Sequence, residues 1–153
     1  MATTTATITL SSADLLSDNM SLSATMNLYK GGTTATGLDQ MNYHRLVIPT
    51  GTNFDLIEES AALTEDANYV YIINKNTDVT DYVKISINAE EIGRLYAGDW
   101  LFMPWDNDLT DETSVSDQTG NDSSIEIEAF THEHIIEFAL FHNGETLQTS
   151  ADV

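Results

Sequence analysis

The stretch YVYIINKNTDVTDYVKISI, residues 69–87, decides the fold class. A run of β-branched and aromatic residues, 69–73, precedes a polar turn at 74–80. In the second run, 82–87, apolar and polar side chains alternate, so every second side chain lies on the same face of a strand. Two such runs joined by a short polar turn predict a β-hairpin.

The same patterns recur along most of the chain, and helical periodicity does not. A second hairpin is predicted where two runs flank the turn at 97–99. With no helix longer than two turns expected, about ten short strands predict an antiparallel β-sandwich or jelly-roll-like domain. Outside 69–87, the predicted strands are 7–10, 20–28, 43–48, 54–57, 92–96, 100–103, 125–130 and 134–141.

Composition divides the chain into three parts. Residues 1–38 are rich in Thr, Ser, Ala and Gly and include a strongly alternating strand, so they are predicted to form an extended N-terminal arm or strand segment. Such an arm needs a covering surface, although the strand could equally complete the chain's own sheet. Residues 39–142 are predicted to form the β-sandwich domain, and 143–153 a loose C-terminal tail.

Charge restricts the classes of partner. The chain has 5 Lys and Arg against 25 Asp and Glu, a formal net charge of −20. This surface would repel nucleic acid, whose binding depends on cationic side chains, and it disfavours anionic membranes. No apolar stretch reaches the length of a membrane span, and no basic, apolar secretory leader is expected at the start. The absence of cysteine excludes disulfides and thiolate chemistry.

His132-Glu133-His134 is the most suggestive motif for metal chemistry. Residues two apart on a strand share a face, so His132 and His134 could reach one ion. One hypothesis is a cupin-like metal enzyme, although the glutamate is one residue too early for that motif. Another is a metal on a trimer axis, as in some phage fibre tips. The favoured interpretation is two solvent-exposed histidines at the start of a strand.

Two further groups of side chains have a binding and a structural interpretation. Asp106 and Asp108, in the acidic segment 104–123, could bind calcium, but a solvated loop is the preferred interpretation. Trp100, Phe102 and Trp105 are expected on one face, either as a carbohydrate platform or, preferably, as core packing. We expect no catalytic residues, because no nucleophile motif is present.

The order of several segments resembles a group of small virion structural proteins of tailed marine bacteriophages, those of cyanobacteria especially. Two positions depart from the pattern of that group: Ala97 stands where a proline is expected and Asp99 where a glutamate is expected. Both are mild changes of turn chemistry. The segments that carry the resemblance are 8–15, 20–23, 36–38, 69–77, 92–100, 103–105 and 136–141.

The resemblance implies a β-domain of a virion, without a catalytic role or cofactor. The expected function is capsid decoration, in which the protein lies on the outer surface of the phage head and stabilises it as a cement protein. The expected partners are the major capsid protein or other virion proteins and further copies of the chain, as a homotrimer. A tail- or fibre-associated host-contact module is the alternative, and a cupin-like enzyme is a third hypothesis.

Overall fold

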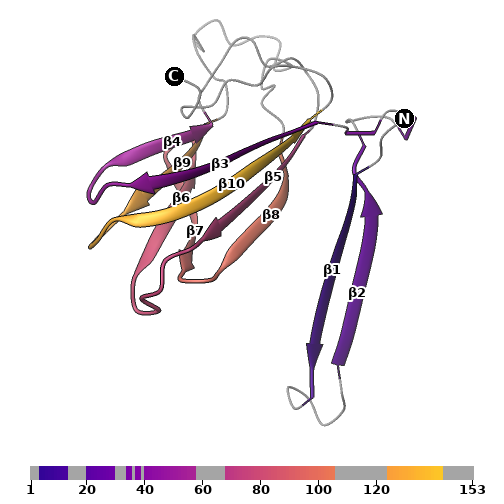
Figure 1. Cartoon of the computed structure of the whole chain (residues 1–153), viewed down its shortest axis with the longest axis horizontal. Coiled ribbons are helices and arrows are strands. Elements are labelled where there is room, and N and C mark those ends of the chain that lie inside the picture. The colour runs from indigo at the N-terminus through magenta and orange to yellow at the C-terminus, as the bar shows by residue number, and fades with distance from the viewer. Residues whose placement is uncertain are drawn as a thin grey trace, which may run out of the picture.

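The computed structural model describes residues 4–13, 20–29, 34–35, 37–38, 40–57, 68–105 and 124–142. All regular secondary structure in these parts is β-strand. The strands form a two-stranded hairpin and two four-stranded antiparallel sheets packed face to face (Figure 1). The predicted all-β antiparallel sandwich is confirmed.

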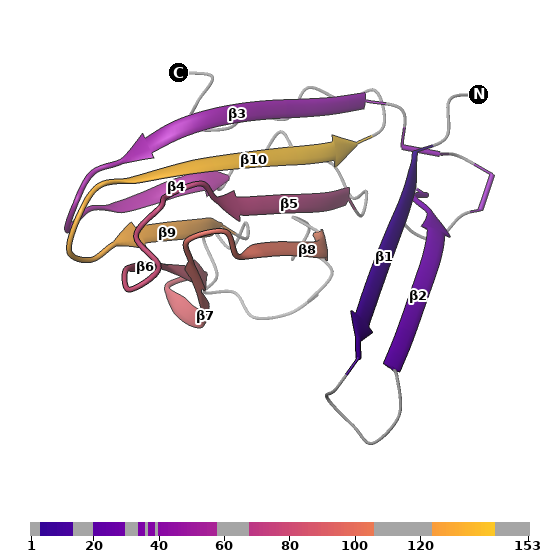
Figure 2. The same cartoon turned by 60° about the horizontal axis from the view of Figure 1, so that its bottom comes forward.

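The two sheets of the sandwich are each built from strands far apart in the sequence (Figure 2). The first sheet contains, in spatial order, β3 (Gln40–Ile48), β10 (His134–His142), β5 (Asn68–Asn74) and β8 (Trp100–Trp105). The second sheet contains, in spatial order, β4 (Asn53–Ile57), β9 (Ile125–Ala129), β6 (Tyr82–Ile87) and β7 (Glu90–Tyr96).

Strand pairing in the sandwich is nested. β3 pairs with β10, β4 with β9, β5 with β8 and β6 with β7, so each pair encloses the next one along the sequence. Among these eight strands, only β6 and β7 are consecutive and lie in the same sheet. Every other connection crosses from one sheet to the other.

Both predicted hairpins are therefore wrong in their pairing. The strands at 69–73 and 82–87 belong to different sheets, and so do those at 92–96 and 100–103. Sheets pack only about 10 Å apart, so a turn of a few residues can cross the core as easily as it can reverse within one sheet. The turn between β7 and β8 is bonded to β5, because the Gly98 N–H donates to the Asn74 carbonyl at 2.8 Å.

The hairpin that does form, β6–β7, has a two-residue turn at Asn88 and Ala89. Their φ angles of 51° and 64° match the type I′ turn that suits the twist of paired strands. The turn is fixed to the start of β9, because the Ser124 N–H donates to Asn88 Oδ1 at 2.8 Å. The sequence did not predict this hairpin, because Ala89 occupies a position where glycine is the usual signal.

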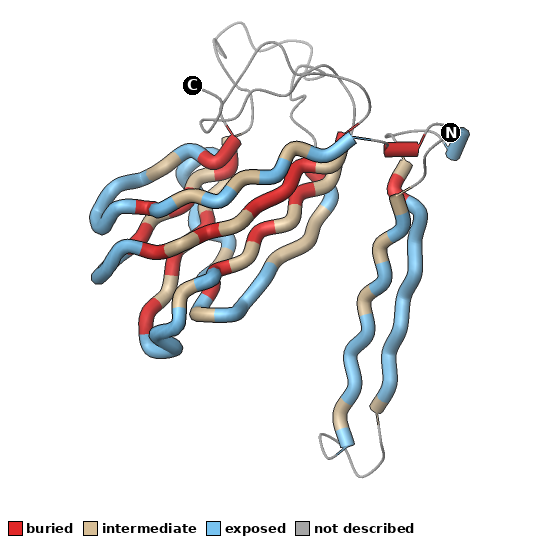
Figure 3. The backbone as a smooth tube through the Cα atoms, in the orientation of Figure 1, coloured by how far each residue is buried: buried red, intermediate tan, exposed pale blue. Residues whose placement is uncertain are grey.

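The hydrophobic core lies between the two sheets, and its buried residues recur along the strands of both sheets, as the red segments of Figure 3 show. Phe138 is fully buried and is among the largest of these side chains. Burying one such side chain contributes about 2–3 kcal/mol relative to leaving it in water. Its fully buried neighbours include Val70, Ile72, Ile136 and Leu140 of the first sheet and Val83, Ile125 and Ile127 of the second.

The N-terminal segment forms a separate hairpin of β1 (Thr5–Ser12) and β2 (Met20–Asn27). Among the described residues, these strands contact almost only each other, and they project away from the sandwich (Figures 1 and 2). At the base, the Leu28 N–H donates to Thr4 O at 2.8 Å and the Leu38 N–H to Leu28 O at 3.0 Å. Of the two alternatives left open for the strand at 20–28, the structure has it pair with β1 and, within the described ranges, not complete a sheet of the sandwich.

Candidate functional site

The solvent side of the first sheet, which we call the outer face, is apolar and aromatic. Strand alternation turns half of the side chains of β3, β10, β5 and β8 away from the core. Trp100 is 48% exposed, although it belongs to an ordered strand, in which it pairs with Ile73 of β5. The strand registers align these side chains in three rows: Met41–Phe141–Tyr69–Pro104, Tyr43–Ala139–Tyr71–Phe102 and Arg45–Glu137–Ile73–Trp100.

Aromatic rings contact one another across three strands of this face. Tyr69 stacks on Phe102 with ring centroids 5.5 Å apart, and Phe102 meets Phe141 edge-on at 6.3 Å. Tyr71 and Trp100 lie 6.3 Å apart. Such contacts hold large side chains in fixed positions, so the outer face is a preformed surface.

The charged side chains in the three rows are one pair of opposite sign. Arg45 Nη1 lies 3.2 Å from Glu137 Oε1 on the neighbouring strand. The pKa of Tyr43 is raised by partial burial and by its hydrogen bond to Glu137, so its hydroxyl stays protonated at neutral pH. The three rows therefore carry no net charge, on a chain whose formal charge is −20.

The second sheet presents an ordinary charged surface. Lys84 Nζ lies 3.1 Å from Glu128 Oε2 and 4.6 Å from the centre of the Phe130 ring. The Arg94 guanidinium lies 4.6 Å from the centre of the Tyr82 ring. Cations thus cover the aromatic rings here and keep this side polar. The two sides of the sandwich differ in character, and the outer face is the unusual one.

The arm also has one apolar and one polar face. The register places Ala6 opposite Met26, Ile8 opposite Ala24 and Leu10 opposite Leu22, and we call this side the arm's apolar face. Leu10 and Leu22 are 52% and 57% exposed.

Hydroxyl groups occupy the other side of the arm. Thr7 and Thr25 hydroxyls lie 3.1 Å apart, and those of Thr9 and Ser23 lie 3.3 Å apart. An isolated two-stranded hairpin is only marginally stable in water, so this geometry favours an arm that gains stability by covering its apolar face.

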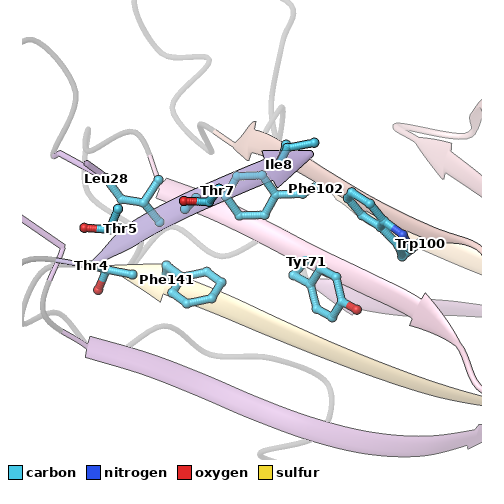
Figure 4. A pocket seen from close by; sticks show the side chains of 10 residues that line it. Thr4, Thr5, Thr7, Ile8, Leu28, Tyr71, Trp100, Phe102 and Phe141 are labelled. Carbon is cyan, nitrogen blue, oxygen red and sulfur yellow. The ribbon is translucent and has the colours of Figure 1, made fainter. Parts of the chain in front are cut away.

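A cleft of about 380 Å³ separates the start of the arm from the outer face. Thr7 and Ile8 of β1 line one side, and Tyr71, Phe102 and Trp100 line the other (Figure 4). The arm therefore leaves space above its own sheet, and much of both apolar surfaces stays open to solvent.

A second cluster of interest surrounds Asp81, whose side chain is 6% exposed. Its Oδ2 lies 2.8 Å from His132 Nδ1 and 3.2 Å from His134 Nε2. Its Oδ1 accepts the Tyr82 N–H at 2.9 Å. Hydrogen bonds from the Thr131 hydroxyl, His132, the Tyr82 backbone and His134 hold the pKa of this carboxyl well below its usual value, despite its burial.

His134 continues this network into the core. Its Nδ1 lies 3.2 Å from Asn74 Nδ2 and 3.3 Å from Asn76 Nδ2. Amide nitrogens donate, so Nδ1 accepts and the ring proton lies on Nε2, toward Asp81. Asn74 Nδ2 also donates to the Leu95 carbonyl at 3.0 Å. Because Asn74 is in the first sheet and Leu95 in the second, the network fastens the two sheets together.

The predicted metal ligands have a different environment from the one expected. His132 is exposed as predicted, but the prediction that His134 is exposed is wrong, since it is completely buried. Within the described ranges, no group of three His, Asp or Glu side chains is arranged to hold a metal ion. Asp106 and Asp108 lie outside the described residues. No local spacing could have predicted Asp81 as the shared partner, because the histidines follow it by about fifty residues.

The prediction that Trp100, Phe102 and Trp105 share one face and pack in the core is also corrected in part. Trp100 and Phe102 lie on the outer face, whereas Trp105 points into the core and is buried. A strand alternates with a period of two, so residue 105 cannot share a face with 100 and 102 unless a bulge intervenes. The prediction of core packing is therefore confirmed for Trp105 and wrong for Trp100 and Phe102.

Comparisons of the chain with protein-family models, curated proteins and solved structures give no match. Among the described residues there is no helix that could span a membrane.

Proposed function

We propose that this protein is a non-enzymatic structural component of a phage virion, a decoration protein that lies on the outer surface of the head and cements it. The observation that carries the proposal is the uncharged aromatic outer face beside an arm with its own exposed apolar face. Exposed apolar surfaces of this extent on soluble proteins mark sites of association.

The strand order supports a finer description of the fold. We infer a jelly roll, because the nested pairing of β3 with β10, β4 with β9, β5 with β8 and β6 with β7 is the order that winding a long hairpin produces. Jelly rolls are common among viral capsid domains, although a fold by itself does not determine function.

The distribution of charge suits a protein that covers a particle. The acidic chain and the charged second sheet favour solubility, while the neutral outer face lets a neighbour approach without repulsion. A protein that binds only the assembled shell stabilises it by mass action, and a modest apolar contact repeated over the shell adds up. The major capsid protein is the proposed partner on the head.

Immunogold labelling of purified particles, with quantitative mass spectrometry of copy number, tests this proposal. We expect label over the whole head and a copy number comparable with that of the shell subunits. Labelling of the tail alone at low copy number would contradict decoration and favour a tail- or fibre-associated module. Absence from purified particles would contradict any virion role.

A further inference from the structure

We propose that the arm of one copy packs, through its apolar face, on the outer face of a second copy of this chain. The inference rests on the proposed function, whose expected partners include further copies of the chain beside the major capsid protein, but it concerns a contact that can be tested apart from the virion. The occupant of both surfaces is therefore the protein itself.

The arm does not cover its own sheet. A cleft lies between β1 and the outer face, lined by Ile8 on the arm and by Tyr71 and Trp100 on the sheet. Toward the tip of the arm, Leu10 and Leu22 are both more than half exposed. An arm fixed at its base by Thr4, Leu28 and Leu38, and open along its apolar face, has the geometry of an exchanged element.

The two surfaces match in size and chemistry. Eight residues per strand give the arm a length of roughly 27 Å, and the face of the first sheet extends roughly 24 Å along its strands. Both surfaces are apolar, and the outer face has Arg45 and Glu137 already paired, so seating the arm leaves no charge uncompensated. Two copies of an acidic chain can meet here without juxtaposing like charges.

Area also favours a contact that uses both surfaces. Four strands about 4.8 Å apart give the outer face roughly 450 Å², and the arm's apolar face adds roughly 250 Å². The arm can cover only an area of the outer face equal to its own, so a reciprocal exchange would bury roughly 500 Å² on each copy and roughly 1,000 Å² in total, which reaches the lower limit for a specific interface. Neither surface alone reaches that size, so exchange of arms is the arrangement that forms a stable assembly.

Cross-linking between differently labelled copies tests the contact directly. The chain contains no cysteine, so one copy can carry Leu22→Cys and another Tyr43→Cys as the only thiols. After the full-length variants are mixed and oxidised, we expect a covalent heterodimer containing one copy of each. A matched mixture of Ser23→Cys with Tyr43→Cys places the thiol on the arm's polar face and should give at least tenfold less of it.

The double variant Leu22→Cys/Tyr43→Cys distinguishes an arm that packs on another copy from an arm that packs on the outer face of its own chain. Cross-linked oligomers support exchange, whereas a monomer with an internal disulfide at every protein concentration would overturn it. Failure of the cross-link with correct labelling of heads would remove this inference and leave the proposed function. A cross-link between copies of a protein that is absent from purified particles would support this inference and contradict the proposed function.

Charge variants provide a second readout that does not depend on thiols. Leu10→Asp/Leu22→Asp should weaken self-association about a hundredfold in sedimentation experiments, because two exposed leucines are replaced by charges at the contact. The control Thr9→Asp/Ser23→Asp makes the same change of charge on the arm's other face and should leave association within about threefold. Equal effects of both pairs would overturn the proposal.

Discussion

His134 Nε2 lies 3.2 Å from Asp81 Oδ2, a contact between a completely buried imidazole and a nearly buried carboxylate. The carboxylate also accepts from His132 at 2.8 Å, so two histidines that resemble a metal pair share one acid. We call the group formed by Asp81, His132, His134 and Asn74 the Asp81 clasp. It connects the two sheets, because Asn74 donates to the Leu95 carbonyl of the opposite sheet.

The Asp81 clasp should contribute measurably to stability. Asp81→Asn removes the charge that His132 and His134 face and places an amide donor against the Nε2 proton of His134. We expect the free energy of unfolding at pH 7 to fall by about 2 kcal/mol, as measured by urea denaturation. Asp78→Asn is the control, because Asp78 is exposed and its carboxylate accepts hydrogen bonds from Thr80 of the same turn. Equal losses in the two variants would contradict the clasp.

The stability that Asp81 provides should depend on pH in a defined direction. Its pKa in the folded protein lies below the ordinary value of about 3.9 for an aspartate in an unfolded chain. The contribution is therefore complete above about pH 4 and is lost as the pH falls from there toward the folded pKa. The difference in unfolding free energy between the wild type and Asp81→Asn should shrink below pH 4. A difference that grows with acidity would contradict this sign.

Ala89 should be a site where a single substitution stabilises the protein. It holds a φ of 64° in the β6–β7 turn, a region that side chains with a Cβ disfavour. Ala89→Gly should raise the free energy of unfolding by about 1 kcal/mol in thermal or urea denaturation. The control Ala97→Gly lies in a turn outside the positive-φ positions and should lower stability or leave it unchanged. A loss of stability in Ala89→Gly would contradict the turn geometry.

Trp100 should contribute to association and little to folding. Trp100→Ala removes a large exposed ring from the outer face, so self-association should weaken at least tenfold while the urea midpoint of the monomer stays nearly constant. Ile92→Ala is a matched control, because Ile92 is 49% exposed on β7 of the second sheet. Equal weakening by both would show that the outer face has no special role.

Much of the fold could be predicted from the two-residue period, because one buried face imposes that pattern on each strand. The pairing of neighbouring strands could not. The turns after β5 and β7 have the polar composition of a hairpin turn, yet each crosses the core, and composition does not encode that choice. Pairing of β10 with both β3 and β5 depends on contacts between residues far apart in the chain.

The sequence contains an indication of the outer face that a search for alternating apolar and polar residues misses. The residues Tyr69, Val70, Tyr71, Ile72 and Ile73 are apolar at every position, which indicates a strand with two apolar sides. One side packs in the core and the other forms the centre of the outer face. The Asp81 clasp had no such signal, because its partners come together only through the pairing of distant strands.

Hydrogen exchange of the arm tests the central claim most directly. Backbone amides of β1 and β2 in the full-length protein would be followed by mass spectrometry over a thousandfold range of protein concentration. We predict fast exchange at the lowest concentration, where the arm is an isolated hairpin, and at least tenfold slower exchange at the highest, where it lies on another copy. Exchange in β1 and β2 that is the same at every concentration would contradict the account.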